Sequence, residues 1–183
     1  MVKVDAVRGL KEDFNAWELD VLIDYIIEVH HSYVIESLPV LSQYAQKVAK
    51  VHGESHKVLL EINTLVHEII EELSVHLKKE EQVLFPYIKQ LVAAKAKGKE
   101  VGTPHFQTVS NPISMMENDH EKVGAVFKHI AQLTNNYTPP EWACNTFKAL
   151  YAMLEEFEQD LHQHIHLENN ILHPKALALE NNN

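Results

Sequence analysis

The stretch His76-Leu-Lys-Lys-Glu80-Glu-Gln-Val-Leu-Phe-Pro86 carries the pattern that decides the fold of this chain. A second copy, His164-Ile-His-Leu-Glu168-Asn-Asn-Ile-Leu-His-Pro174, follows 88 residues later, and both read H-x-x-x-E-x-x-[V/I]-L-x-P. A histidine and a glutamate four residues apart lie on one face of a helix. Two such pairs that point inward from two helices of a bundle supply half or more of the ligands for two metal ions. The repeat therefore predicts a metal centre, with a di-iron centre as the first hypothesis.

The composition indicates one soluble domain. The chain has 183 residues, of which 45% are hydrophobic and 23% are charged, and this is ordinary for a globular protein with a substantial core. The net charge of −10 argues against nucleic acid as a partner, because no basic surface is available to displace phosphate counterions. We expect the domain to cover 15–178, with a flexible N-terminal segment at 1–14 and a flexible C-terminal tail at 179–183.

Cysteine content and hydropathy indicate where the protein works. The single Cys144 cannot form an intrachain disulfide and suits a reducing compartment. No run of 18 or more apolar residues is present, and the N-terminal residues lack the apolar core of a signal peptide. We therefore expect a cytoplasmic protein with no membrane partner.

Hydrophobic spacing predicts helix almost throughout the chain. The first helix opens near Asn15 and ends at Gly53, and the second covers about 57–96, with Pro86 expected to kink or interrupt it. The third opens at Asn111-Pro112, and Thr138-Pro-Pro-Glu141 has the pattern of a capping box for the fourth. Residues 97–111 form a longer connection between two helical hairpins. The predicted fold is all-α, an antiparallel four-helix bundle with a longer connection between helices 2 and 3.

Polar residues occupy positions on the apolar faces of these helices. A carboxylate buried in a bundle core costs several kcal/mol unless it binds a metal ion or another cation. One histidine on such a face is more often an ordinary core residue, and one H-x-x-x-E is more often a simple helical pair. Six polar positions in a matched repeat need a shared explanation, and a pair of metal ions supplies it. The candidate ligands are His31, His76, Glu80, His120, His164 and Glu168.

Spacing along the chain supports this set. His31 and His76 are 45 residues apart, with Gly53 near the midpoint, so the two histidines lie at the same height in a hairpin. His120 and His164 are 44 residues apart, although the turn at 135–137 lies nearer to the first of them.

Helix geometry excludes two other histidines. His52 lies 21 residues from His31, roughly 30 Å along a helix, which is too far to share a metal site. His30 points about 100° away from His31 along the helix, towards a less apolar face.

Four histidines and two glutamates suggest two terminal histidines on each metal ion, with Glu80 and Glu168 bridging the ions. A solvent-derived oxo or hydroxo bridge would bring each ion to about five ligands and leave a position for a small molecule. Imidazole mixed with carboxylate favours iron or manganese over structural zinc. Asp119, Asp160 and Tyr33 are candidates to orient the ligating imidazoles from outside the metal shell.

The sequence around the ligands resembles a known family. The ligand pattern is similar to that of hemerythrin-like domains. The segments 73–86, 112–120, 134–140, 143–151 and 167–174 resemble the Repair of Iron Centres di-iron proteins, and the resemblance covers about 18–178. It implies a non-haem di-iron centre that helps to restore iron–sulfur clusters damaged by nitric oxide or peroxide, through iron donation or nitric oxide chemistry.

The resemblance leaves alternatives open. A hemerythrin-like protein could bind or sense oxygen or nitric oxide without turnover, and an iron-storage protein could use the same ligands, so the sequence does not decide whether the protein is an enzyme. The expected partners are a diatomic molecule and damaged iron–sulfur proteins. Typical family members also carry an N-terminal domain with paired cysteines, which we do not find in this sequence; functions that need that domain are not expected of this chain alone.

Overall fold

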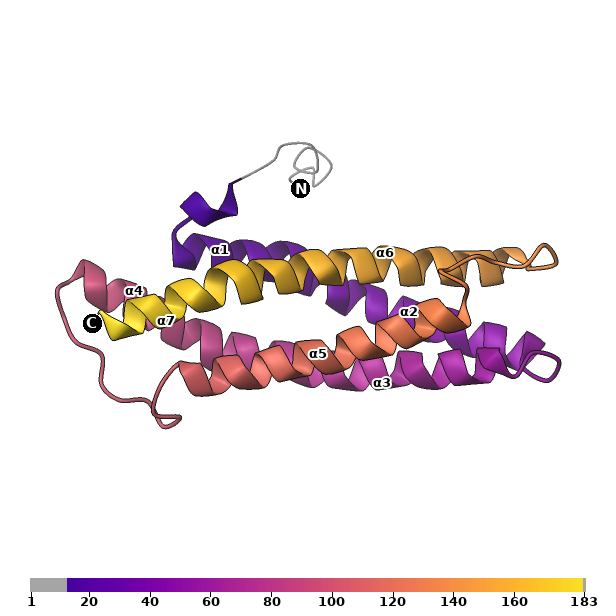
Figure 1. Cartoon of the computed structure of the whole chain (residues 1–183), viewed down its shortest axis with the longest axis horizontal. Helices are drawn as coiled ribbons and strands as arrows, with labels where there is room; N and C mark the ends of the chain where they lie inside the picture. The colour runs from indigo at the N-terminus through magenta and orange to yellow at the C-terminus, as the bar shows by residue number, and fades with distance from the viewer. Residues whose placement is uncertain (1–12, 183) are drawn as a thin grey trace.

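The computed structural model describes residues 13–182 and shows a bundle of four long helical arms (Figure 1). The first arm contains α1 (Leu19–Tyr25), η3 (Ile26–His31) and α2 (Ser32–His52). The second contains α3 (Val58–Lys79), η4 (Glu80–Leu84) and α4 (Phe85–Ala96). The third is α5 (Ser110–Leu133), and the fourth contains α6 (Asn145–Leu167), η5 (Glu168–Leu172) and α7 (His173–Asn181). Within the described residues no strand is present, so the predicted all-α class is confirmed.

The arms pack as the sequence predicted. α2 packs against α3 and α6, and α3 packs against α5. The connections α2–α3 and α5–α6 lie at one end of the bundle, and the connection from α4 to α5, residues 97–109, crosses the other end (Figure 1). The predicted long connection between helices 2 and 3 is therefore confirmed. None of the described helices has the length and apolar character that a membrane span requires.

The apolar core is divided into two clusters. One contains residues of α2, α3, α5 and α6, such as Val34 and Phe157. The other contains residues of α1, α4, α5 and α7 with the adjoining η segments, such as Ile26 and Leu84. Along the first arm, His31 lies between Ile26 of the second cluster and Val34 of the first. A polar layer therefore crosses the bundle where the two clusters meet.

The predicted starts of helices 1 and 4 are wrong. Residues Phe14–Ala16 form a short 3-10 turn, and α1 begins only at Leu19, because Trp17 is extended and packs with Phe14 and Tyr25. Thr138 does not cap helix 4. The three residues 135–137 have positive φ, and α6 begins at Asn145 with Cys144 at its N-cap.

The C-terminal end is more ordered than a flexible tail from 179 would be. α7 continues to Asn181, and Leu179 is buried. The Glu180 carboxylate accepts hydrogen bonds from the Val109 amide at 2.9 Å and the Tyr87 hydroxyl at 2.8 Å, which ties the end of α7 to the start of α5. Most of the segment predicted to be flexible at 1–14 lies outside the described residues.

Gly53 allows the tight turn between α2 and α3, and a substitution tests this. A Cβ at this position would lie 2.3 Å from the Ala49 carbonyl oxygen and 2.4 Å from Cδ2 of Leu60. Gly53→Ala is therefore expected to lower the free energy of unfolding by about 1–3 kcal/mol. Gly124→Ala is the matched control, because a Cβ there meets open space inside α5 and should raise the same free energy by about 0.5–1 kcal/mol. Chemical denaturation measures both, and equal effects would contradict the packing argument.

Candidate metal centre

All six predicted ligands lie in the polar layer of the bundle. Each is between 0 and 5% exposed. His31 comes from η3, His76 from the last turn of α3, and His120 from the middle of α5. In the second copy of the repeat, His164 lies near the end of α6 and Glu168 begins η5, just as Glu80 begins η4 in the first copy. The structure thus brings together His31, His76, Glu80, His120, His164 and Glu168.

Three of these residues lie in π-helical segments, which the sequence reading did not predict. Glu80 begins η4 and Glu168 begins η5. In each, the amide five residues after the glutamate donates to the carbonyl of that glutamate, so the helix is locally widened. Pro86 and Pro174 explain the position, because a proline has no amide hydrogen and its ring clashes with the carbonyl four residues before it. The L-x-P end of the repeat therefore supplies a widened turn at each glutamate, a feature that often marks functional sites.

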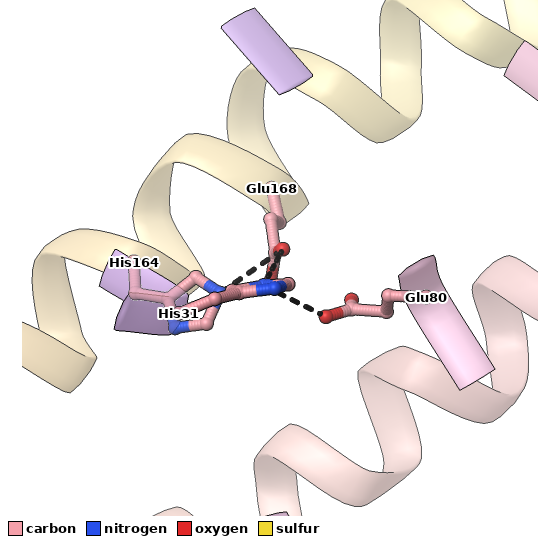
Figure 2. A group of neighbouring side chains, drawn as sticks. All are labelled: His31, Glu80, His164 and Glu168. Carbon is pink, nitrogen blue, oxygen red and sulfur yellow. Dashed lines mark hydrogen bonds and ion pairs between the residues drawn. The ribbon is translucent and has the colours of Figure 1, made fainter. Parts of the chain in front are cut away.

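The Nε2 atoms of the four histidines point towards the two carboxylates. Those of His31 and His76 each lie 3.3 Å from Oε2 of Glu80. On the other side, the Nε2 atoms of His120 and His164 lie 3.2 and 3.1 Å from the two oxygens of Glu168. Figure 2 shows Glu80 and Glu168 approaching His31 from different helices.

The atoms form two groups that share both carboxylates. The first group is His31, Glu80, His164 and Glu168, and the second is His76, Glu80, His120 and Glu168. Within each group the candidate ligand atoms all lie within 4.8 Å of one another. Two neighbouring ions could therefore each take two imidazoles and share both glutamates.

The unpaired atoms at the centre fit a pair of cations. Nε2 of His31 and both oxygens of Glu80 are buried without a hydrogen-bond partner, and so is Oε2 of Glu168. Nε2 of His120 and of His76 are 3.0 Å apart, so one of the two nitrogens must carry a proton and donate to the other unless a cation binds both. A buried polar atom without a partner is unfavourable, and cations between these atoms would satisfy all of them.

The charges in the centre also suit a bound cation. Burial opposes protonation of His31 and of His120, but hydrogen bonds and the charges of Glu80 and Glu168 outweigh it, so both pKa values lie above the ordinary one. Burial would raise the pKa of Glu168, yet His164 and His120 hold it well below its usual range. The pKa of Glu80 is also lowered, despite burial and the nearby charge of Glu168, by His76 and His31. Without metal, protons on the imidazoles are therefore the available counter-charge.

Two side chains that the sequence reading missed hold the outer nitrogens of ligand histidines. Nδ1–H of His31 donates to Oε1 of Glu81 at 2.8 Å, and Nδ1–H of His120 donates to Oδ1 of Asn169 at 2.9 Å. Glu81 and Asn169 each directly follow the glutamate of their repeat. That shared position is a signal that the sequence contained, but each target histidine lies on the other arm of the same hairpin. Such bonds fix the ring orientation and leave Nε2 free to bind metal.

The predicted orienting residues have mixed outcomes. Asp119 lies 3.8 Å from Nδ1 of His76 and accepts a hydrogen bond from Lys79 at 2.8 Å. Asp160 contacts His30 at 3.1 Å, and the His30 ring stacks on a ligand histidine with centroids 5.6 Å apart, so Asp160 acts one layer further out than predicted. Tyr33 packs against Phe157.

Two other histidines lie in contrasting places. His52 is at the end of α2, where its Nε2 lies 3.5 Å from the Cys144 sulfur, in line with its exclusion from the centre. His173, which the sequence did not distinguish from solvated or supporting histidines, is 1% exposed, and its ring is parallel to that of His120 at 6.4 Å.

Comparison with known proteins gives a consistent result. The family described as hemerythrin HHE cation binding domain matches residues 22–176. The chain is 43% identical over 169 residues to the "Iron-sulfur cluster repair protein YtfE" of Yersinia pseudotuberculosis serotype IB (strain PB1/+), a match that covers 92% of this chain and 71% of the relative. The protein of the same name from Yersinia pestis (strain Pestoides F) matches with the same identity and coverage.

Removal of the two carboxylates tests the metal centre. Glu80→Gln combined with Glu168→Gln keeps the side-chain volume but removes both negative charges, so iron should fall from about two ions per chain to near zero. Elemental analysis after anaerobic loading measures the content, and circular dichroism checks the fold. His52→Ala is the control and should retain iron. Full iron content in the double variant would show that these glutamates are not ligands.

The pH dependence of the metal-free protein gives a second test. His31 and His120 have folded pKa values above 6.5, so their contribution to stability is present below pH 6.5 and is lost as pH rises through the folded values. Glu80 and Glu168 have folded pKa values below 4.5, so their contribution is lost only as pH falls through those values. Denaturation at a series of pH values should show the free energy of unfolding falling above pH 6.5.

Bound iron should give the opposite pH dependence of the free energy of unfolding near neutral pH. Metal binding requires neutral imidazoles, so iron-dependent stabilisation should weaken as pH falls through the raised pKa values of His31 and His120. A metal-free protein whose stability is unchanged between pH 6.5 and 9 would contradict the protonation argument.

Proposed function

The chain belongs to the hemerythrin HHE cation-binding family, and from this we propose that it is a di-iron protein that repairs iron–sulfur clusters damaged by nitric oxide or oxidants. The observation that carries the proposal is the pair of four-residue groups that share Glu80 and Glu168. Relatives that the chain matches over 92% of its length are named for the repair of iron–sulfur clusters. We place this activity in the cytoplasm, where such clusters are exposed to these agents.

The chain's own residues define what the centre can do. His31, His76, His120 and His164 would be terminal ligands through Nε2, and Glu80 and Glu168 would each contact both ions. Four imidazole nitrogens and two carboxylates suit iron. Bound iron would supply reversible redox chemistry and a source of iron for a client cluster.

The surroundings of the centre exclude bulk water. Phe85 stacks on His31 with centroids 5.6 Å apart, and apolar clusters lie on both sides of the polar layer. The bundle holds the ligands in place, and the hydrogen bonds that His31 and His120 donate to Glu81 and Asn169 fix two of the imidazoles. This enclosure favours a small reactant, and we propose nitric oxide as the diatomic partner of the iron.

A repair assay tests the function. A dehydratase whose [4Fe–4S] cluster has been damaged by nitric oxide is incubated anaerobically with the iron-loaded protein and a reductant. We expect its activity to recover faster than with the same concentration of free ferrous iron, because the protein delivers iron from a defined site. The metal-free protein and the Glu80→Gln/Glu168→Gln variant should give no more recovery than buffer.

The same preparation separates the alternatives. Recovery no faster than with free iron, together with stoichiometric binding of nitric oxide or oxygen, would favour a carrier or sensor. Continuous consumption of nitric oxide over many turnovers would instead identify an enzyme.

A further inference from the structure

The two copies of the repeat differ at a position that supports the metal ligands. The 88-residue offset relates the two glutamates of the centre, and it also relates Glu81 to Asn169. Both residues accept a hydrogen bond from Nδ1 of the histidine on the other arm of their own hairpin, at 2.8 and 2.9 Å. The geometry is the same and the acceptors differ, since one is a carboxylate and the other a neutral amide.

The acceptor changes how strongly the histidine binds metal. A carboxylate draws the Nδ1 proton towards itself and makes Nε2 a better donor, and charge-assisted hydrogen bonds are roughly twice as strong as neutral ones. His31 has such a bond, and it belongs to the group with His164. His120 has the neutral acceptor, and it belongs to the group with His76.

We propose that the two metal positions hold their ions unequally, so that the ion bound by His76 and His120 is released first and the ion bound by His31 and His164 is retained. Glu81 is the positioning residue that makes the difference. The proposal rests on the proposed function, because a protein that donates iron needs one ion that can leave while the other preserves the centre.

Other carboxylates do not cancel this difference. Asp119 is the acidic group nearest to the outer side of His76, but the distance of 3.8 Å is too long for a hydrogen bond. Its two oxygens are instead engaged by Lys79 at 2.8 Å and Lys122 at 3.4 Å, which neutralise it. The outer nitrogen of His164 has no partner among the described residues, so the retained position depends on Glu81.

A second pair of equivalent residues adds to the asymmetry. Phe85 and His173 occupy the same place in the two copies. Phe85 stacks on His31 at 5.6 Å and shields it with an apolar ring, whereas His173 lies parallel to His120 at 6.4 Å and presents a polar one. Both rings are only 1% exposed, so the two positions differ in the polarity beside the ligand histidine and not in solvent access.

Chelation of iron from the loaded protein tests the proposal. Excess coloured ferrous chelator is added anaerobically to the wild-type protein without any client. We expect two phases of one iron each, with rates that differ by about tenfold or more, the size of effect found when such outer hydrogen bonds are altered. Release of both ions in a single phase would overturn the proposal.

Two isosteric variants assign the phases. Glu81→Gln should speed the slow phase by about 10–100-fold, and Asn169→Asp should slow the fast phase by about tenfold. Mössbauer spectra of protein loaded with ⁵⁷Fe give a signature that a merely structural role would not produce. Glu81→Gln should change the doublet that persists after the first ion has left, and Asn169→Asp should change the doublet that is lost.

Matched controls carry the same charge changes at exposed positions. Asn170→Asp adds a charge one residue along, at a side chain that contacts His166 instead of a ligand. Glu71→Gln removes an exposed charge from the same arm as Glu81. Neither should alter either phase, and an equal effect of the controls would reduce the proposal to a general charge effect and overturn it.

The outcome is independent of the repair assay. Two phases assigned in this way would stand even if the protein failed to restore a damaged cluster. Conversely, a single phase combined with efficient repair would defeat only the unequal positions and leave the proposed function intact.

Discussion

Two buried carboxylates control this structure. Glu80 and Glu168 lie in a layer between two apolar clusters, where an uncompensated charge costs several kcal/mol. Four imidazoles surround them, and without metal they can offer only protons as counter-charge. Cations would satisfy the unpaired oxygens and nitrogens together. Binding of metal and stability of the bundle are therefore linked, because the ions stabilise the only polar layer that the described part of the core contains.

The backbone is adapted to the same constraint. A regular helix that reached Pro86 or Pro174 would leave a carbonyl unpaired and crowded by the ring. The widened turns η4 and η5 lie directly before these prolines, and each pairs the glutamate's carbonyl with the amide five residues on. The proline thus sets the turn, and the turn begins at the residue whose carboxylate faces the centre. The H-x-x-x-E-x-x-[V/I]-L-x-P pattern encodes both the ligands and the local backbone that presents them.

Much of this could be predicted from the sequence, and what could not has physical reasons. Helical periodicity predicted the bundle, and it selected His31 over His30 because His30 points about 100° away towards a less apolar face. The starts of α1 and α6 were mispredicted, because tertiary packing of Trp17 and the left-handed residues at 135–137 override local capping patterns. Glu81 was missed because its partner lies 50 residues away on another arm, and no periodicity within one helix reports such a contact.

The internal repeat also shows where two equivalent halves have become different. The ligand residues of the two copies are identical in type, whereas Glu81 and Asn169, and Phe85 and His173, differ. Both differences fall on residues that touch a ligand histidine without belonging to either candidate ligand group. A change of ligand would remove an ion, but a change of the acceptor behind a ligand only adjusts how tightly the ion is held. Symmetry in the ligands and asymmetry behind them would let one bundle keep one ion in place while it gives up the other.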